Sequence, residues 1–403
     1  MTDKTPPGRE LPDAGNAEKK PRAVIFFSEV FRGHHYGKNH PLNIPRVALT
    51  VDLIETYQAL SSSEKQTARP ATLDELSRFH SRPYFAALKK CQAKGRAGPD
   101  MRQQFNLGNF ENPLFEKMFD VPALAAGAGI QGAQKVLDGI MAFNPAGGMH
   151  HAMPEKARGF CFINDVVLTI LTLRRAGLRV LYFDMDAHHG DGVETAFDPD
   201  PDTLTLSFHM DTDYAYPRKG GQIKDIGTAR ASVNLPLPKG VNDTEYQLAF
   251  ETIWPLVMTR FQPDAIVLQA GTDILFQDPL GAFSISNTLF FDIVQKILTS
   301  SPGHPDGRPR LMITGGGGYH PIALARCWTG LWSLLAGWDL PDAIPATGRK
   351  MLQHLRWTEE EEADPGTTAA QYTRRLDPPM PGPVRDDISQ RLEYLCQSHP
   401  LLA

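Results

Sequence analysis

The sequence contains only four cysteines among its 403 residues, and no two of them form a CxxC pair. This spacing predicts no disulfide framework and indicates free thiols in a reducing cytoplasm. The chain also lacks an apolar run of the ~18 residues that a membrane span requires. Its first twenty residues lack the apolar core of a signal peptide. We therefore expect a cytoplasmic protein that has no membrane segment.

An excess of positive charge is also missing. Lys and Arg number 41 and Asp and Glu number 46, which gives a formal net charge of −5. Nucleic-acid binding requires a concentrated positive field against the phosphates, so we expect no direct nucleic-acid binding. With 41% hydrophobic and 22% charged residues, the composition is that of a globular chain rather than of a disordered one.

Apolar runs alternate with helical patterns along the chain. Apolar runs predict strands at 23–28, 178–186, 203–209, 264–271 and 308–318. Helical spacing of apolar residues predicts helices at 46–60, 121–142, 165–177, 244–261 and 288–300. We expect a loop with a short helix at 61–80 and a long ordered loop at 95–120. This alternation predicts an α/β fold whose mostly parallel sheet is covered by helices on both faces.

Polar residues follow the predicted strands where those strands end. In an open parallel sheet, ligands bind outside the carboxyl ends of the strands. Strand 178–186 runs into the sequence DMDAHHGDG, strand 264–271 runs into Gly-Thr-Asp, and strand 308–318 ends in four glycines. We therefore expect the functional site at this edge of the sheet.

The segment DMDAHHGDG (184–192) places three carboxylates and two imidazoles close together. A divalent cation would relieve their repulsion. Asp186 and His188 are two apart and can point the same way, and Asp273 at a neighbouring strand end is the natural third ligand. This set leaves a position open for water or substrate, as in a catalytic site for zinc, although Fe(II), Co(II) or Mn(II) suits the same donors. For this segment alone, an ion-pair cluster or capping carboxylates stays the alternative.

A separate loop carries His150 and His151 after two glycines. A lone His pair is more often a surface or core feature. Here Asp184 and Asp191 are not required as metal ligands, so each could accept a hydrogen bond from one imidazole. Two such His–Asp pairs beside the metal would form an acid–base apparatus.

Tyr319 directly follows the glycine run 315–318. Glycines such as Gly317 permit a close approach of the backbone to a ligand. Tyr319 is then either an incidental residue of a flexible turn or a phenol that stabilises a developing oxyanion.

These segments resemble, in order along the chain, the successive motifs of the zinc-dependent histone deacetylase family in the arginase/deacetylase superfamily. Within that family, the motifs most resemble those of the bacterial acetoin-utilisation deacetylases. It is carried by HHYGKNHPLNIPRV (34–47), NLGNFENPLF (106–115), GGMHHA (147–152), RGFCFINDV (158–166), DMDAHHGDGVETAF (184–197), LSFH (206–209), AGTDILFQDPLGAF (270–283) and GGGGYH (315–320).

The resemblance implies a three-layer α/β/α fold around a mainly parallel eight-stranded sheet. It assigns residues 22–340 to the catalytic domain. The polar, Pro-rich composition of residues 1–21 predicts a mobile tail, and the polar residues 341–403 predict a C-terminal extension that packs on the domain or trails from it. It implies the same ligands that the residues indicate, Asp186, His188 and Asp273, with His150, His151 and Tyr319 around them.

The resemblance also implies a substrate tunnel. Gly159 would accept a substrate N–H through its carbonyl, and Phe160 and Tyr216 would form opposite walls. Glu111 falls where relatives have a rim Asp that holds the substrate backbone, and Arg46 falls near an inner acetate-release cavity. A structural K⁺ or Na⁺ would bind near Asp184, Asp186, His188, Ser207 and Phe208.

Three positions depart from the family pattern. RKGG follows Pro217 where many relatives have GTG, Glu111 replaces the rim Asp, and His320 follows Tyr319. We expect these departures to alter specificity more than chemistry.

The resulting hypothesis is a metal-dependent amide hydrolase that removes acetyl or similar short acyl groups from lysine side chains of proteins. An acetylpolyamine or other small-molecule amidohydrolase is the first alternative. A non-catalytic acyl-lysine binding module is less favoured, because Asp186, His188, Asp273 and Tyr319 are intact. A manganese ureohydrolase of the arginase branch is also less favoured, because the His pair and the GGGGY segment are not typical of that branch. The sequence leaves the formation of a homo-oligomer open.

Overall fold

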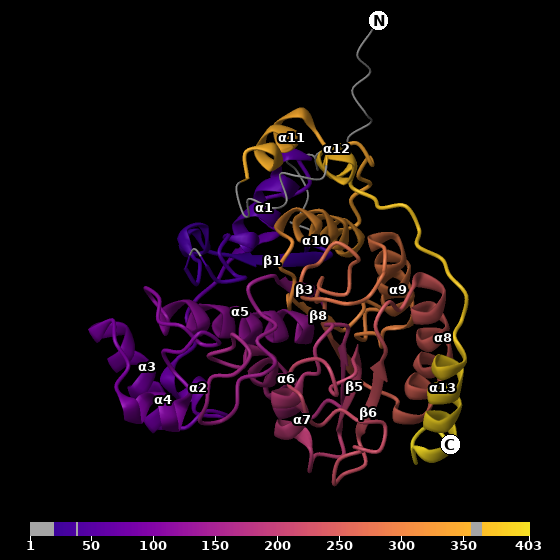
Figure 1. Cartoon of the computed structure of the whole chain (residues 1–403), viewed down its shortest axis with the longest axis horizontal. Helices are drawn as coiled ribbons and strands as arrows, with labels where there is room; N and C mark the ends of the chain where they lie inside the picture. The colour runs from indigo at the N-terminus through magenta and orange to yellow at the C-terminus, as the bar shows by residue number, and fades with distance from the viewer. Residues whose placement is uncertain (1–19, 38, 356–364) are drawn as a thin grey trace, which may run out of the picture.

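The computed structural model describes residues 20–37, 39–355 and 365–403 (Figure 1). The predicted mobile tail at 1–21 lies outside the described residues except for its last two positions.

One sheet of eight strands, all parallel, runs through the molecule in the order β2-β1-β3-β8-β7-β4-β5-β6. The predicted α/β fold with an eight-stranded sheet is therefore confirmed, and every neighbouring pair of strands is parallel. The strands are β1 (Ala23–Phe27), β2 (Lys65–Thr67), β3 (Met141–Asn144), β4 (Val180–Asp184), β5 (Thr203–Met210), β6 (Ser232–Leu237), β7 (Ala265–Gln269) and β8 (Leu311–Thr314).

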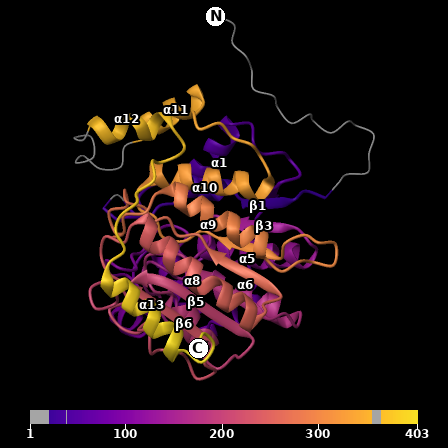
Figure 2. The same ribbon diagram turned by 90° about the vertical axis from the view of Figure 1, so that its right-hand side faces the viewer.

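Helices cover both faces of the sheet. Three pack on one face, namely α5 (Asp120–Leu137), α6 (Asp165–Arg175) and α7 (Asp191–Phe197). On the other face lie α1 (Arg46–Thr56), α10 (Pro321–Ala336), α9 (Asn287–Ser300) and α8 (Asp243–Phe261), which follow one another across Figure 2. This gives the three layers that the resemblance implied.

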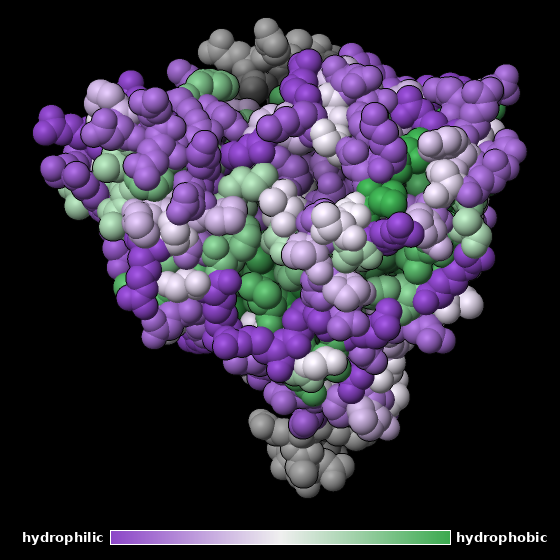
Figure 3. Space-filling view, turned by 90° about the horizontal axis from the view of Figure 1, so that it is seen from below, coloured by the Kyte–Doolittle hydropathy of each residue, from purple (hydrophilic) through white to green (hydrophobic). Residues whose placement is uncertain are grey.

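The inner strands are apolar along their whole length because both of their faces are covered. β1 reads AVIFF and β7 reads AIVLQ, and every residue of both strands is buried. Such continuous runs are typical of a parallel sheet between two helix layers. At the surface, hydrophilic residues prevail, and apolar residues gather in the recessed middle of the face seen in Figure 3. Among the described helices, none combines the length and the apolarity required to cross a bilayer.

Four strands that are adjacent in the sheet, β3, β8, β7 and β4, end at the same edge. The segments that follow them hold the predicted site residues. Because the strands are parallel neighbours, residues from about 150 to 319 in the chain meet over this one edge.

Several sequence predictions differ from the structure. The predicted helix at 121–142 ends at Leu137, and its last residues form β3 after a break at Gly139, whose φ is +77°. The predicted loop at 95–120 contains the helix α4 (Pro99–Phe105). Segment 61–80 contains β2 as well as the short helix α2 (Leu73–Leu76). The strand β6, the 3-10 helix η1 (Glu29–Gly33) and the helix α3 (Arg82–Lys94) were not predicted.

The C-terminal segment lies against the domain in its described parts. After α11 (Ala346–Gln353) and α12 (Pro365–Thr373), the chain descends past α9 and α8 to α13 (Asp386–Ser398), as Figure 1 shows. α13 packs on β6, the last strand of the sheet. Arg391 donates to the carbonyl of Pro236 at 2.8 Å, and His399 Nε2 lies 2.9 Å from the carbonyl of Ser232. The segment thus covers an otherwise open sheet edge.

Candidate active site

Asp186, His188 and Asp273 converge after β4 and β7. One donor atom from each lies within 4.8 Å of the others. His188 Nδ1 is 2.9 Å from Asp273 Oδ2 and 3.4 Å from Asp186 Oδ1. The metal–ligand bonds of a divalent ion such as zinc are about 2.0–2.2 Å long, so ligands around one ion lie about 3–4 Å apart. The spacing of the three donors therefore fits a metal.

The charges at this triad also fit a cation. Both carboxylates are almost wholly buried. Burial, together with the nearby Asp186 carboxylate, raises the pKa of Asp273 to about 7. Two buried carboxylates repel each other, and a divalent ion between them would remove this repulsion. The triad is thus a possible metal site with oxygen, oxygen and nitrogen donors.

Backbone groups hold the two carboxylates in place. The N–H of Gly317 donates to Asp186 Oδ2 at 2.6 Å, and the N–H of Ala187 donates to Asp273 Oδ1 at 2.9 Å. At position 317 only glycine fits, because a Cβ there would lie 2.0 Å from Asp273 Oδ2. Gly317, which follows β8, therefore lets the backbone come close enough to hydrogen-bond to the ligand Asp186.

His150 and His151 each pair with one aspartate. His150 Nδ1 lies 2.9 Å from Asp184 Oδ2, and His151 Nδ1 lies 2.9 Å from Asp191 Oδ1. The two Nε2 atoms are 3.0 Å apart, and that of His150 is 3.9 Å from Asp186 Oδ1. Both free imidazole nitrogens therefore face the same point beside the metal triad.

The surroundings push the pKa values of the two imidazoles apart. Burial alone would lower the pKa of His150, but the carboxylates of Asp184 and Asp186 outweigh it and raise the pKa to about 9. Burial, together with the charge of His150, lowers the pKa of His151 to about 4. Such a separation allows one imidazole to stay charged while the other is free to accept a proton.

Two further polar residues, Gln269 and Tyr182, contact the pair of His150 and Asp184, and neither was predicted as a site residue from the sequence. Gln269, the last residue of β7, donates through Nε2 to the Gly148 carbonyl at 3.2 Å, and this amide lies 2.7 Å from His150 Nδ1. The Tyr182 hydroxyl lies 2.7 Å from Asp184 Oδ2 and 3.0 Å from Gln269 Oε1. For Gln269 the sequence signal is a polar residue at the end of an apolar strand, whereas Tyr182 lies in the middle of β4 and carries no such signal.

Tyr319 lines the same pocket as the His pair and two members of the metal triad, Asp186 and His188. Its backbone N–H donates to Asp278 Oδ2 at 2.6 Å, which fixes the turn after the glycines. Its ring packs edge-on against Phe160, with the ring centroids 6.1 Å apart. Burial, together with Asp273 and Asp186, holds the pKa of its hydroxyl well above the usual value, so the phenol stays a hydrogen-bond donor.

The predicted tunnel residues come together, but not as a simple pair of walls. Phe160 lines the pocket and packs on His40, with ring centroids 4.5 Å apart. Tyr216 stands beyond Gly159 and packs edge-on against His151 at 4.8 Å. Of the two predicted walls, only Phe160 is among the residues that line the pocket itself.

Glu111 faces inward rather than only toward the rim. Its Oε1 accepts hydrogen bonds from the Gly159 N–H at 2.6 Å and from the Tyr216 hydroxyl at 2.8 Å. Its Oε2 accepts a hydrogen bond from Asn106 at 3.2 Å. The carboxylate therefore joins both sides of the predicted tunnel.

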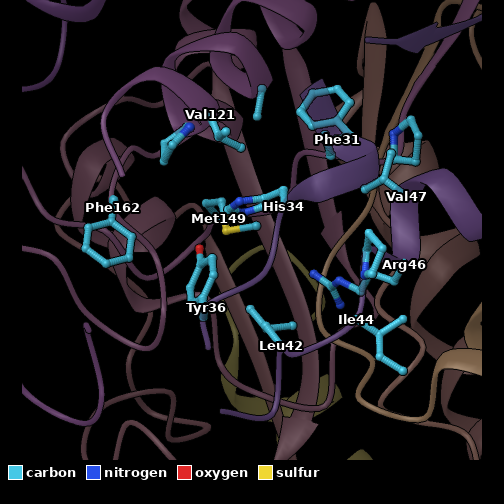
Figure 4. A pocket seen from close by; sticks show the side chains of 15 residues that line it. Phe31, His34, Tyr36, Leu42, Ile44, Arg46, Val47, Val121, Met149 and Phe162 are labelled. Carbon is cyan, nitrogen blue, oxygen red and sulfur yellow. The ribbon is translucent and has the colours of Figure 1, made fainter. Parts of the chain in front are cut away.

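A second, mostly apolar pocket of about 600 Å³ adjoins the first and shares Leu42, Arg46 and Met149 with it (Figure 4). The first pocket, which Asp186 and His188 line, has a volume of about 310 Å³. Arg46 donates to the Gly318 carbonyl at 2.8 Å and lies over the Trp328 ring. Arg46 thus lines both pockets, and its place beside an acetate-release cavity stays a prediction.

The residues of the predicted monovalent-cation site lie on neighbouring strands. Asp184 on β4 is in register with Ser207 on β5, and Phe208 follows Ser207. The side chain of Ser207 bonds to His209 Nδ1 at 2.8 Å. The binding of K⁺ or Na⁺ here stays a prediction.

Residues 40–335 match the family defined as "Histone deacetylase domain". Histone deacetylase 9 of Arabidopsis thaliana is 37% identical over 81% of this chain and 76% of its own length. The chain therefore belongs to the histone deacetylase family.

Solved structures show the same relationship. The crystal structure of an HDAC homolog from Aquifex aeolicus superposes with a TM-score of 0.87 at 35% identity, covering 93% of this chain and 99% of that one. A crystal structure of an HDAC homolog complexed with SAHA matches equally well. Histone deacetylase 1 of Oryza sativa subsp. japonica is 36% identical over 84% of this chain, but this chain spans only 64% of that protein's length.

Proposed function

We propose that the protein is a metal-dependent amide hydrolase that removes acetyl or similar short acyl groups from lysine side chains of proteins. The observation that carries this proposal is the convergence of two His–Asp pairs on one point beside the Asp186–His188–Asp273 triad. Family membership supports the reaction class.

Asp186, His188 and Asp273 would hold the ion. A bound divalent ion, for which zinc is our proposal, supplies Lewis acidity toward the amide carbonyl and lowers the pKa of a water to about 7. Protein groups do the rest. His151, which is neutral at neutral pH, accepts the water proton at Nε2 and later returns it to the leaving amine.

His150 and Tyr319 would stabilise the charge that develops during the attack. The carboxylates of Asp184 and Asp186 raise the pKa of His150, which favours the positively charged form of this imidazole. The Tyr319 hydroxyl donates a hydrogen bond to the carbonyl oxygen as that oxygen becomes negative. Neither residue must change its position, because Asp184 and Asp278 already fix the His150 ring and the Tyr319 backbone.

The substrate chain would lie between the Gly159–Phe160 segment and Tyr319. Phe160 offers an apolar face to the methylene groups of lysine, and the Gly159 carbonyl would accept the amide N–H. Gly317 lines the floor of the pocket beside the ligands. Glu111 and Tyr216 would set the width of the opening.

One assay tests the proposal. The purified protein is offered acetyl-lysine peptides, longer acyl-lysine peptides and acetylpolyamines, and the metal content of the same sample is measured. We expect turnover of acetyl-lysine peptides and one divalent ion per chain. Preference for acetylpolyamines would instead favour a small-molecule amidohydrolase, and binding without turnover would favour an acyl-lysine binding module.

The variant Asp273→Ala tests whether activity depends on the proposed metal site. This variant should lose both the metal and the activity, because one ligand is removed from a buried site. Asp74→Ala is the control, since the Asp74 side chain is 91% exposed and lies away from the site. Full activity in Asp273→Ala would overturn the proposed metal site.

A cytoplasmic location, a bacterial origin, kinship with the acetoin-utilisation branch and a structural K⁺ or Na⁺ belong to the same proposal. It also includes an acetylated protein as the partner and no direct binding of nucleic acid. The net charge of −5 supports the last of these.

A further inference from the structure

Arg158 is the one cation in direct contact with the His–Asp pairs among the described residues, and nothing in the proposed reaction uses it so far. We propose that Arg158 is a positioning residue. Its guanidinium ties the Gly159–Phe160 turn of the substrate pocket to the Asp191 carboxylate, which in turn orients His151. The inference rests on the proposed deacetylase function and adds a residue to it.

The contact to Asp191 is short and sheltered. Arg158 NH1 lies 2.6 Å from Asp191 Oδ2, and the two side chains are only 20% and 11% exposed. The other oxygen of the same carboxylate, Oδ1, lies 2.9 Å from His151 Nδ1. Asp191 is therefore held from both sides, and its plane cannot turn without breaking one of the two contacts.

The backbone of Arg158 opens a tight turn. Its N–H donates to the Cys161 carbonyl at 3.0 Å, and the Cys161 N–H donates back to the Arg158 carbonyl at 2.7 Å. The two central residues have positive φ, +51° for Gly159 and +68° for Phe160. A positive φ is unfavourable for a residue with a large side chain such as phenylalanine.

Such a turn requires support from outside. Glu111 accepts the Gly159 N–H at 2.6 Å, and the Tyr36 hydroxyl donates to the Phe160 carbonyl at 2.9 Å. Arg158 adds the third support, the ion pair to Asp191. Of the three, this one alone connects the turn that carries the pocket wall with a residue that hydrogen-bonds to an imidazole, since Asp191 Oδ1 lies 2.9 Å from His151 Nδ1.

The Arg158 guanidinium also contacts Tyr216. It lies over the Tyr216 ring, 5.8 Å from the centroid, and this ring packs on His151. The imidazole is thus fixed by Asp191 on one nitrogen and by the Tyr216 ring at its edge, and Arg158 touches both. Loss of Arg158 should therefore loosen the proton acceptor and the pocket wall together.

The test compares Arg158→Gln, Arg158→Lys and the wild type on an acetyl-lysine peptide. We expect Arg158→Gln to lower kcat by about 10–100-fold, the range for residues that orient a ligand or base through another residue, and to raise KM because the turn loosens. Arg158→Lys should recover part of the kcat, since an ammonium can still contact Asp191. Metal content should stay unchanged in both variants.

The same substitution in an Asp191→Asn background separates the two effects. If Arg158 acts on kcat through Asp191, Arg158→Gln should cause little further loss of kcat there, while its effect on KM persists. An equal loss of kcat in both backgrounds would overturn the proposed route through Asp191.

Arg174→Gln is the matched control. Its side chain is 19% exposed and pairs with Asp200 at 2.9 Å, but Asp200 precedes β5 at the opposite edge of the sheet. Arg174→Gln should keep the wild-type kcat and KM. If Arg158→Gln behaves like Arg174→Gln in an active enzyme, Arg158 has no positioning role. If the wild type itself turns over no acetylated amine, the proposed function fails first, and the role of Arg158 falls with it.

Discussion

Gly317→Ala changes one hydrogen into a methyl group at the floor of the metal site. The new Cβ would lie 2.0 Å from Asp273 Oδ2, whereas ordinary contacts begin at 3.4 Å, so the carboxylate must retreat by about 1.4 Å. The N–H of Ala187 holds the other oxygen of that carboxylate and limits how it can turn. Metal–ligand distances tolerate only about 0.2 Å, so we expect the bond between Asp273 and the ion to be lost.

The consequence for activity can be estimated. A misplacement of about 1 Å in a reacting group costs about 100-fold in rate, and kcat/KM should fall by at least that factor. Overpacking a core position costs about 1–3 kcal/mol, which is less than the 5–15 kcal/mol by which domains are usually stable. The variant should therefore fold. The φ of Gly317 is not in the left-handed region, so strain of the backbone does not contribute.

The assay is metal content by elemental analysis, with kcat/KM and thermal unfolding measured on the same preparation. Gly33→Ala is the control, because a Cβ at that glycine meets nothing within 4 Å and its φ is also outside the left-handed region. Gly33→Ala should bind metal like the wild type. A Gly317→Ala protein that holds one ion per chain and keeps its activity would refute the argument from the steric clash.

Three further outcomes are expected. Tyr319→Phe should lower kcat by about 10²–10³-fold, as for the loss of one oxyanion donor, with metal content and unfolding temperature unchanged; loss of metal would show a structural role instead. Phe160→Ala should raise KM for acetyl-lysine peptides and weaken discrimination against bulkier acyl groups, and an unchanged KM and substrate ranking would contradict its place in the pocket wall. The hydrogen bond from Arg69 lowers the pKa of Glu75 to about 2, so Glu75→Gln should cost about 1 kcal/mol of unfolding free energy near pH 7. Because the folded-state pKa lies below the unfolded value, denaturant titrations should show this difference narrowing as the pH falls below about 4.5, and a difference independent of pH would contradict the ion pair.

The sequence predicted the strands that carry the site well. β4, β7 and β8 are apolar runs that end in conspicuous polar residues, and the predicted ranges contain all three. The strands β2 and β3 were missed for different reasons. β2 reads KQT and has no apolar signal, whereas β3 follows an apolar helix so closely that the two merged into one pattern. The signal that separates them is Gly139 with its positive φ.

The sequence indicated that Asp184 and Asp191 each pair with one imidazole of the His pair. The structure has His150 beside Asp184 and His151 beside Asp191, but other contacts of the site could not be predicted. The inward orientation of Glu111 could not be predicted, because it depends on how a loop near residue 110 folds over the turn at Gly159. The contact of Arg158 with Asp191 was inaccessible for the same reason, since 33 positions separate the two residues in the chain.

The order of the strands has a consequence for how the protein acquires its metal. The ligands come from segments after β4 and β7, which are neighbours in the sheet but lie more than 80 residues apart in the chain, and Gly317 after β8 buttresses them. Parallel pairing over such distances is slow, because a long loop must close before any contact rewards it. A nascent chain that ends before β8 therefore has the ligands without their support. We therefore expect the metal to bind in the last stage of folding. The bound ion would then stabilise a sheet whose strands have already paired.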